Sequence, residues 1–226
     1  SFGSAQPLKV GQFSVGINIV RAERKSWIFN VSQKRLRKEP SADYDAEALA
    51  VGGLRVIDQF DGFNGGPDRY DWKVVGKKEI YVPYNTYKLG DKSLKRSQVL
   101  GKHSVNPDLV RYELHRVWVV EGTVKAGFRH VYPKRNFFLD EDSWAVLYED
   151  AFDVRGNLWR VAMHPLMQAY DVPMPFYRAH VFHDLFNGGY LVEGLDNESK
   201  VPWRFGFKGK AADWTSEAIM DTASKH

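Results

Sequence analysis

The chain has 226 residues, of which 43% are hydrophobic, 14% aromatic and 27% charged, and its formal net charge is +4. This length and apolar content predict a sizeable core and exclude global disorder. The absence of cysteine excludes disulfides, thiolate catalysis and cysteine-ligated zinc. No run approaches the roughly 18 apolar residues of a membrane helix, and we expect no signal peptide within the chain.

Strand signals open the sequence. Residues 11–20, GQFSVGINIV, alternate apolar and polar side chains with the period of two that is typical of a β-strand. Residues 25–31 follow after a short charged turn, so the two segments predict a hairpin. Residues 41–53 predict a short helix with Asp43 as its N-cap, ended by two glycines.

The middle and the end of the chain predict further β-structure. Residues 72–89 indicate a strand with a bend at Pro83, and 88–108 indicate a loop with one helical turn. A four-stranded antiparallel meander is predicted over 111–124, 128–139, 144–152 and 158–164. A hairpin is predicted over 176–186 and 190–195, and a terminal helix over 213–224, capped by Asp213 or Thr215.

Both faces of this meander are apolar. In 111–124, one face carries Tyr112, Leu114, Trp118 and Val120, and the other carries Val117 and Val119. In 144–152, the alternation places Trp144, Val146, Tyr148 and Phe152 opposite Ala145, Leu147 and Ala151. A sheet with one solvated face would alternate cleanly with polar residues. We therefore predict a mainly β (α+β) fold, in which a curved antiparallel sheet, an open half-barrel with a few short helices, surrounds an apolar cavity.

The stretch 60–72, FDGFNGGPDRYDW, combines aspartates with turn-forming residues and aromatics. The spacing of Asp58, Asp61 and Asn64 does not fit a calcium-binding EF-loop. We interpret the stretch as an ordered loop that its aromatic residues hold on the sheet, with Arg69 in a local ion pair between Asp68 and Asp71.

No catalytic constellation is evident. His180 and His183 are three residues apart, so on a strand they point to opposite faces. His115 and His130 could form a pair across one hairpin, with Glu113 as a nearby carboxylate, but no third ligand points to a metal. We predict no metal and no cofactor. Bases and aromatics alternate in 77–88, which also fits an ordinary strand, so we expect no nucleic-acid partner.

Several long motifs resemble a Gram-negative envelope family catalogued as domain of unknown function thirteen twenty-nine. The motifs are WIFNVSQKRLRKEP, DGFNGGPDRYDWKVVGKKEIYVPYN, NPDLVRYELHRVWVVEGT, RHVYPKRNFFLDEDSW and LDNE, within residues 8–200. Members look like relatives of the LolA/LolB lipoprotein carriers. The resemblance implies a LolA/LolB-like half-barrel, a periplasmic location and an RND-type exporter or outer-membrane protein as partner. Family members are about twice as long, and this chain is similar to their C-terminal half.

The resemblance and the two-faced strands lead to one main hypothesis. We predict a single domain, 1–226, in which residues 201–226 form a tail with a short helix. It would be a periplasmic carrier for a lipid or another hydrophobic small molecule. The predicted ligand-binding wall consists of Phe13, Val15, Ile17, Trp27, Phe29, Trp118, Val120, Phe138, Trp144, Val146 and Tyr148. The predicted rim loop contributes Phe63, Asn64, Arg69, Tyr70 and Trp72.

Two alternatives remain open at this point. The protein could be a non-enzymatic envelope adaptor without an internal ligand, whose basic segment 21–38 binds an acidic protein or anionic lipid headgroups. Such binding would weaken steeply with ionic strength, whereas apolar carriage would not. The last alternative is an enzyme that uses His115, His130 and Glu113 as acid and base.

Overall fold

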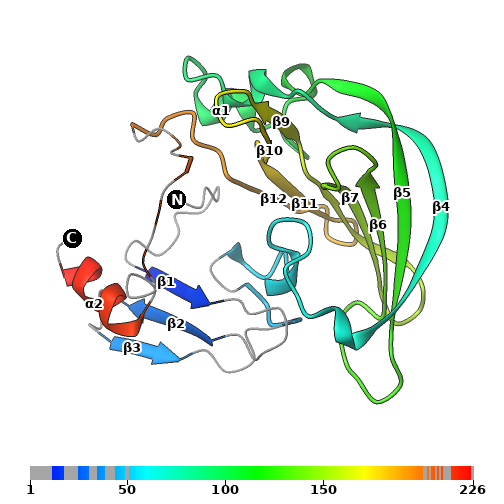
Figure 1. The fold of residues 1–226 in the computed structure, drawn as a ribbon, viewed down its shortest axis with the longest axis horizontal. Coiled ribbons are helices and arrows are strands. Elements are labelled where there is room, and N and C mark those ends of the chain that lie inside the picture. Colours follow the sequence, from blue (N-terminus) through cyan, green and yellow to red (C-terminus); the bar gives the residue numbers. More distant parts are fainter. Residues whose placement is uncertain are drawn as a thin grey trace.

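The computed structural model is built around one antiparallel β-sheet of seven strands. It describes residues 12–17, 25–30, 35–38, 44–48, 51–200, 203, 205, 206, 208, 210 and 215–224. The strand order is β12-β11-β8-β7-β6-β5-β4, so that β12 and β4 form the two edges (Figure 1). The strands are β4 (Tyr70–Pro83), β5 (Tyr112–Val124), β6 (Lys134–Asp140), β7 (Val146–Phe152), β8 (Leu158–Met163), β11 (His180–Asp184) and β12 (Tyr190–Glu193).

Two smaller sheets and several short helices complete the described fold. The strands β1 (Gln12–Ile17), β2 (Lys25–Asn30) and β3 (Arg35–Lys38) form one sheet, and β9 (Leu166–Ala169) and β10 (Met174–Tyr177) form the other. The α-helices are α1 (Arg96–Val99) and α2 (Ser216–Ser224). The 3-10 helices are η2 (Ile57–Gln59), η3 (Pro67–Arg69), η4 (Tyr87–Gly90) and η5 (Pro107–Leu109).

Most of the predicted elements are confirmed. The meander corresponds to β5 through β8, and the predicted hairpins to β1–β2 and β11–β12. Thr215 caps α2, since its hydroxyl accepts a hydrogen bond from the Ala218 amide at 3.2 Å. The sequence patterns do not predict β3, β9 or β10, because charged residues dominate β3 and a proline interrupts β10.

Residues 44–48 of the helix predicted over 41–53 are not helical, whereas Val51 has 3-10 helical geometry. Among its described residues, Glu47 forms an antiparallel β-bridge with Val56. Gly52 and Gly53 have φ angles of 68° and 70°, which glycine adopts without steric cost. The two glycines therefore make the turn that brings the chain back for this bridge. The predicted N-cap, Asp43, lies outside the described residues.

Strand register defines the two faces of the seven-stranded sheet. The inner face is the face of Phe137, Glu149, Ala162, Phe182 and Leu191, which lie opposite one another on successive strands. The outer face is that of Phe138, Tyr148, Met163, Val181 and Val192. Every strand between the two edges thus contributes apolar side chains to both faces, as its sequence indicates.

A β-bulge corrects one prediction about these faces. The register of β6 and β7 shifts between Phe138, which pairs with Tyr148, and Leu139, which pairs with Val146. Because an extra residue reverses the alternation of a strand, Val146 lies on the inner face and Tyr148 on the outer face. The period of two in the sequence had predicted that Val146 and Tyr148 share one face of the sheet.

Residues 84–110 cover the outer face. From this segment, Leu89, Val99, Val105 and Val110 form one buried apolar cluster with Met163, Val181 and Val192 of the sheet. The segment includes α1 and two of the 3-10 helices, and it has no long apolar period of its own. Its helical turns are therefore stabilised mainly by contact with the sheet.

A second segment, which we call the strap (residues 51–66), crosses the inner face. The sheet curves around it, and it lies in the concave space drawn in cyan in Figure 1. Leu54 and Ile57 pack with Val51 against a cluster that contains Ala162, Phe182 and Leu191. Further along the strap, the Phe63 ring makes edge contacts with Trp72 and Phe137, at centroid distances of 5.4 and 5.5 Å.

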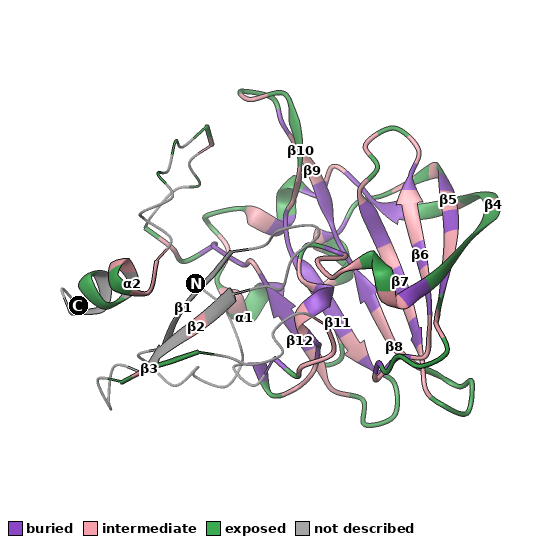
Figure 2. Cartoon of the chain, turned by 60° about the horizontal axis from the view of Figure 1, so that its bottom comes forward, coloured by how far each residue is buried: buried purple, intermediate pink, exposed green. Residues whose placement is uncertain are grey.

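Burial decreases from the middle of the sheet toward the β4 edge (Figure 2). Most of β4 is exposed between its buried first residue, Tyr70, and its buried end at Val82 and Pro83. Its pairing with β5 is interrupted by a β-bulge between Val74 and Gly76. The strap therefore closes only part of the inner face and leaves the surface of β4 and β5 in contact with solvent.

These observations confirm the predicted fold class. The protein is mainly β, its antiparallel sheet is not closed into a barrel, and the described residues include two short α-helices. Among the described residues, no helix is long and apolar enough to cross a membrane.

Gly62 provides a test of how closely the strap lies on the sheet. It has a φ of 83°, and a Cβ placed there would lie 2.8 Å from the Val146 Cβ. We expect Gly62→Ala to lower the free energy of unfolding by about 2–4 kcal/mol, through backbone strain and overpacking. Gly127 is the matched control, because it has a φ of 85° with no atom within 4 Å. Gly127→Ala should cost only the strain, about 1 kcal/mol, and equal costs in urea denaturation would contradict the close contact.

Candidate functional site

Arg135 anchors the strap to the sheet. Its side chain is completely buried on the inner face, where Nε donates to Glu149 at 2.6 Å and Nη1 donates to Asp58 of the strap at 2.8 Å. Gln59, the next strap residue, donates from Nε2 to Glu149 at 3.1 Å. Asp58, which precedes the glycine-rich stretch, thus anchors the strap. Sequence reasoning missed this group, although the alternation along β6 and β7 places both of its sheet residues on one face.

Aromatic and histidine side chains enclose this ion pair. His130 Nε2 lies 2.9 Å from the Asp58 carboxylate, and Arg160 donates to the Tyr132 hydroxyl at 2.9 Å. Burial raises the pKa values of Tyr70 and Tyr132 well above 10, so both phenols stay neutral. Burial alone would lower the pKa of Arg135, but the adjacent carboxylates raise it well above its usual value. The Arg135 guanidinium is therefore held in a buried ion pair with Asp58 and Glu149.

Two further contacts hold the strap at the opposite side of the sheet. Arg55 Nε donates to Glu193 on β12 at 2.5 Å, and both side chains are buried. Asp61 lies 3.3 Å from Nε2 of His180 on β11. His180 Nδ1 in turn lies 2.9 Å from Nδ1 of the fully buried His164, whose pKa is lowered far below its usual value by burial and by His180. The strap is thus fixed at several points across the sheet.

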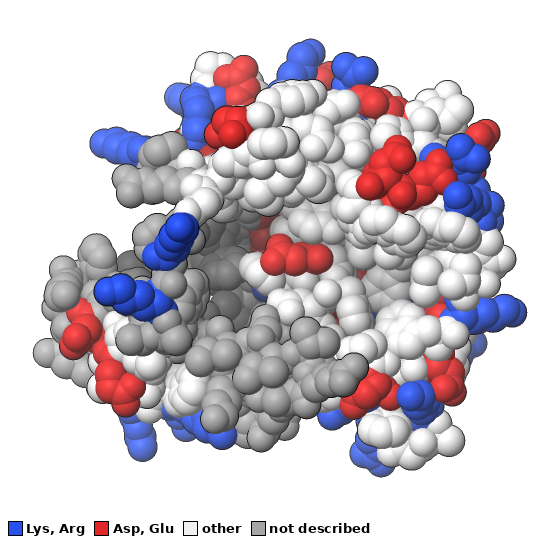
Figure 3. Space-filling view, viewed as in Figure 1, with Lys and Arg blue, Asp and Glu red and all other residues white. Residues whose placement is uncertain are grey.

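The part of the inner face beyond the strap, which we call the open face, carries exposed apolar side chains. By register its apolar members are Trp72, Val74 and Tyr81 on β4 and Leu114, Trp118 and Val120 on β5, and Lys77, Glu79 and Arg116 lie between them. Val74, Tyr81 and Leu114 are 62%, 67% and 58% exposed. Lys77 lies over the Trp118 ring at 4.4 Å from its centroid. Figure 3 shows mostly uncharged side chains on the described surface around a central hollow, with one acidic group beside it. Most charged side chains lie toward the outline of the molecule in this view.

The residues predicted to form the ligand-binding wall do not share one surface. Trp118 and Val120 lie on the open face, and Val146 lies on the inner face under the strap. Phe138 and Tyr148 are on the outer face, where they pack against the core around Val82 and Leu166, so their placement in one wall with Trp118 is wrong. Trp144 lies in the turn between β6 and β7 and is 64% exposed. Trp27 is half-buried, and the side chains of Phe13, Val15, Ile17 and Phe29 lie outside the described part of the chain.

The predicted rim residues begin in the strap and run into β4. The Asn64 amide donates to the Asp58 carbonyl at 2.7 Å, and the Trp72 indole donates to the Pro67 carbonyl at 2.8 Å. Tyr70 is buried beside Arg135. The Arg69 guanidinium lies 3.3 Å from the centroid of the Tyr44 ring, a stacking contact that the local ion-pair prediction did not include. Phe63 and Trp72 meet where the strap gives way to the open face.

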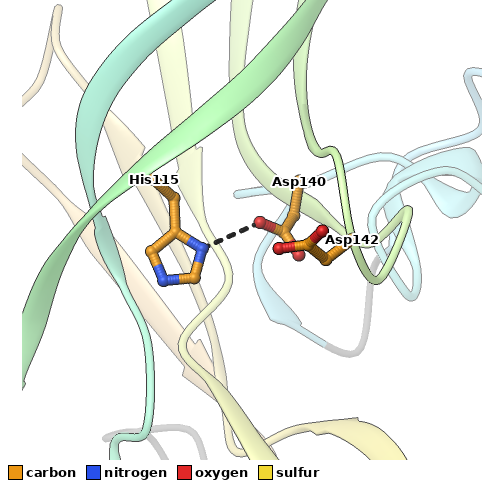
Figure 4. Close-up of side chains that lie close together, drawn as sticks. All are labelled: His115, Asp140 and Asp142. Atoms are coloured by element: carbon orange, nitrogen blue, oxygen red, sulfur yellow. Dashed lines mark hydrogen bonds and ion pairs between the residues drawn. The ribbon is translucent and has the colours of Figure 1, made fainter.

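A separate polar cluster surrounds His115 at the other end of β5. His115 Nδ1 lies 3.0 Å from the buried Asp140 carboxylate (Figure 4). Its Nε2 lies 3.4 Å from Glu113. His115, Asp140 and Asp142 offer ligand atoms that all lie within 4.8 Å of one another, so this group could hold a metal ion. His130 belongs to the Arg135 group, and the predicted pair with His115 does not form.

Comparison with known proteins places these features in a family. The family described as "Protein of unknown function (DUF1329)" matches residues 12–220. The chain belongs to this family. This confirms the resemblance seen in the sequence motifs. An uncharacterized protein of Pseudomonas aeruginosa is 46% identical over 203 residues, which cover 90% of this chain and 45% of that protein. The chain therefore spans about half the length of the curated relative it matches.

Solved structures share the fold at low sequence identity. A domain described as an outer membrane lipoprotein-sorting protein, from Vibrio parahaemolyticus, has a TM-score of 0.58 and 12% identity, covering 92% of this chain and 70% of its own. A DUF1329 family protein from Desulfovibrio piger has a TM-score of 0.59 and 12% identity, with coverages of 92% and 71%. These likenesses establish the fold of this DUF1329 chain.

Replacement of Arg135 tests the anchor. Arg135→Met would leave Asp58 and Glu149 buried without their cation, so we expect a loss of about 3–5 kcal/mol in the free energy of unfolding. Arg116→Met is the control, because Arg116 is half exposed and pairs with Glu141 at the surface, where an ion pair contributes little. Chemical denaturation compares the two variants. Equal, small losses would show that the strap does not depend on this ion pair.

Proposed function

We propose that the protein binds a lipid or another hydrophobic molecule on the open face and carries it within the cell envelope. The observation that supports this proposal is the apolar surface of β4 and β5 beyond the strap, where Val74, Tyr81 and Leu114 are all more than half exposed. Exposed apolar side chains gathered on one sheet face and bordered by charged residues are typical of a binding surface. The fold shared with a protein described as lipoprotein-sorting supports the same class of ligand.

The energetics suit a carrier. Removing about 300 Å² of apolar surface from water at about 25 cal/mol per Å² contributes about 7 kcal/mol. The loss of ligand freedom on association is subtracted from this figure, so the net binding is weak enough to be reversible. The strap has no part in this exchange, because buried ion pairs fix it to the sheet. The ligand would thus bind beside the strap.

We propose that the protein acts in the periplasm and works with an RND-type exporter or an outer-membrane protein. The family resemblance of its motifs supports both statements. A carrier of this kind would receive its ligand at one membrane and deliver it at the other.

Native mass spectrometry of the purified protein, repeated after organic extraction, tests the proposal directly. A reproducible adduct in the lipid mass range, lost on extraction, would support it and would give the ligand class. A mass without adduct, together with no uptake of added fatty acids or phospholipids, would contradict it.

Substitutions on the open face should weaken binding without unfolding the protein. We expect Val74→Ser combined with Leu114→Ser to raise the dissociation constant of a fluorescent fatty acid about 10-fold or more, since each change removes apolar contact worth about 1 kcal/mol. Both side chains are exposed, so thermal stability should change little. Val154→Ser, at a loop position that is 85% exposed, is the control and should leave binding unaltered. Unchanged affinity in the double variant would move the ligand away from the open face.

A further inference from the structure

Both ring nitrogens of His115 face carboxylate oxygens, an arrangement that a neutral imidazole alone does not satisfy. Nδ1 lies 3.0 Å from an oxygen of Asp140, and Nε2 lies 3.4 Å from an oxygen of Glu113. A neutral imidazole carries one N–H and one lone pair, so one nitrogen would direct its lone pair at a carboxylate. Either a second proton or a cation bound at that nitrogen satisfies the arrangement.

The cluster is also rich in negative charge. Glu113 and Asp140 place two carboxylates against the one imidazole. Asp142 adds a third carboxylate. Arg111 pairs with Glu113 at 2.7 Å, at a position where its own side chain is 67% exposed. The cations that flank the turn, Lys77 and Arg116, are both engaged by Glu141.

We propose that His115 Nδ1, Asp140 and Asp142 bind a divalent transition-metal ion of the zinc class. One nitrogen and two carboxylate oxygens form a donor set that such ions accept. Two ligands of a tetrahedral zinc, each about 2.1 Å from the ion, lie about 3.4 Å from each other. The Nδ1 and Asp140 oxygen are already 3.0 Å apart, so only a small adjustment admits the ion. Figure 4 shows the three side chains converging from β5 and from the turn after β6.

The surroundings of the three ligands are already ordered. The Tyr84 ring stacks on His115 at a centroid distance of 4.1 Å. The Ser143 amide and hydroxyl donate to Asp140 Oδ2, at 2.9 and 2.6 Å, which directs the other oxygen, Oδ1, toward His115. Metal-binding histidines usually donate their second N–H to a carboxylate, and Glu113, held by the Asn85 amide at 2.9 Å, stands in that place. This second carboxylate is independent of the three ligands and fixes the tautomer that metal binding needs.

The site has an entrance and a free position. Asp140 is buried, His115 is mostly buried, and Asp142 is exposed, so an ion can enter from solvent along Asp142. Three protein ligands leave the fourth tetrahedral position for water, or for an oxygen of another molecule. The inference does not depend on the proposed carrier function, because none of these residues belongs to the open face.

Calorimetric titration of the purified chain with zinc chloride at neutral pH tests the proposal. We expect one site with micromolar or tighter affinity. His115→Ala and Asp142→Asn should weaken binding at least 10-fold, and Glu113→Gln should weaken it about 10- to 100-fold by releasing the histidine from its orienting partner. His103→Ala, at an exposed histidine outside the cluster, should leave the affinity unchanged.

The variants also separate a metal site from a structural role of the histidine. Asp142 is an exposed turn residue, so Asp142→Asn should retain the circular dichroism spectrum and melting temperature of the parent chain even if His115→Ala does not. X-ray absorption of the loaded protein should show one histidine nitrogen among oxygen ligands. Absence of binding below about 100 µM, or equal affinity of Asp142→Asn and the parent, would overturn the proposal. A doubly protonated His115 at neutral pH, seen by NMR with zinc present, would overturn it as well.

Discussion

The ion pair between Arg135 and the two carboxylates of Asp58 and Glu149 determines how the rest of the molecule is arranged. All three side chains are completely buried, and Asp58 comes from a different part of the chain than the other two. A buried charge is expensive unless it is paired, so the strap has few alternative positions on the sheet. Such a pair adds little net stability compared with apolar residues, but it specifies one arrangement. We infer that its role is to set where the strap ends and where exposed sheet begins.

The division of the inner face follows from this constraint. A curved antiparallel sheet with apolar residues on both faces needs a cover on each side. On the outer face, residues 84–110 cover β8, β11 and β12, and Leu166 of β9 packs beside Val117 of β5. On the inner face the strap covers the strands from β6 to β12, and the long strands β4 and β5 extend beyond it. The open face therefore exists because β4 and β5 are longer than the other strands of the sheet.

Local patterns predicted the elements of this fold better than its contacts. The period of two identified the meander, and turn residues marked its hairpins, because both signals act between near neighbours. The same reasoning failed at the bulge beside Phe138, where one extra residue reversed the faces of Val146 and Tyr148. It also predicted a helix across Glu47. This residue instead forms a β-bridge with Val56, which lies outside the segment whose pattern was read.

The site residues show the same limit. Asp58 and Arg135 are 77 positions apart, and His115 and Asp140 are 25 apart, so no local motif joins either pair. The histidines were noticed in the sequence, but their partners depend on strand register and on the course of the strap. The apolar character of Val74 and Leu114 was visible, whereas their exposure on the folded sheet was not.

The bulge in β4 has a consequence for how copies of the protein meet. An exposed edge strand of 14 residues would be a template for pairing with another chain, and such pairing leads to aggregation. The bulge between Val74 and Gly76 divides this edge into two shorter pieces that differ in twist. Lys73, Lys77 and Lys78 place like charges around the break, so two copies that aligned their edges would repel each other. The strand can therefore expose apolar residues on its face while its edge resists polymerisation.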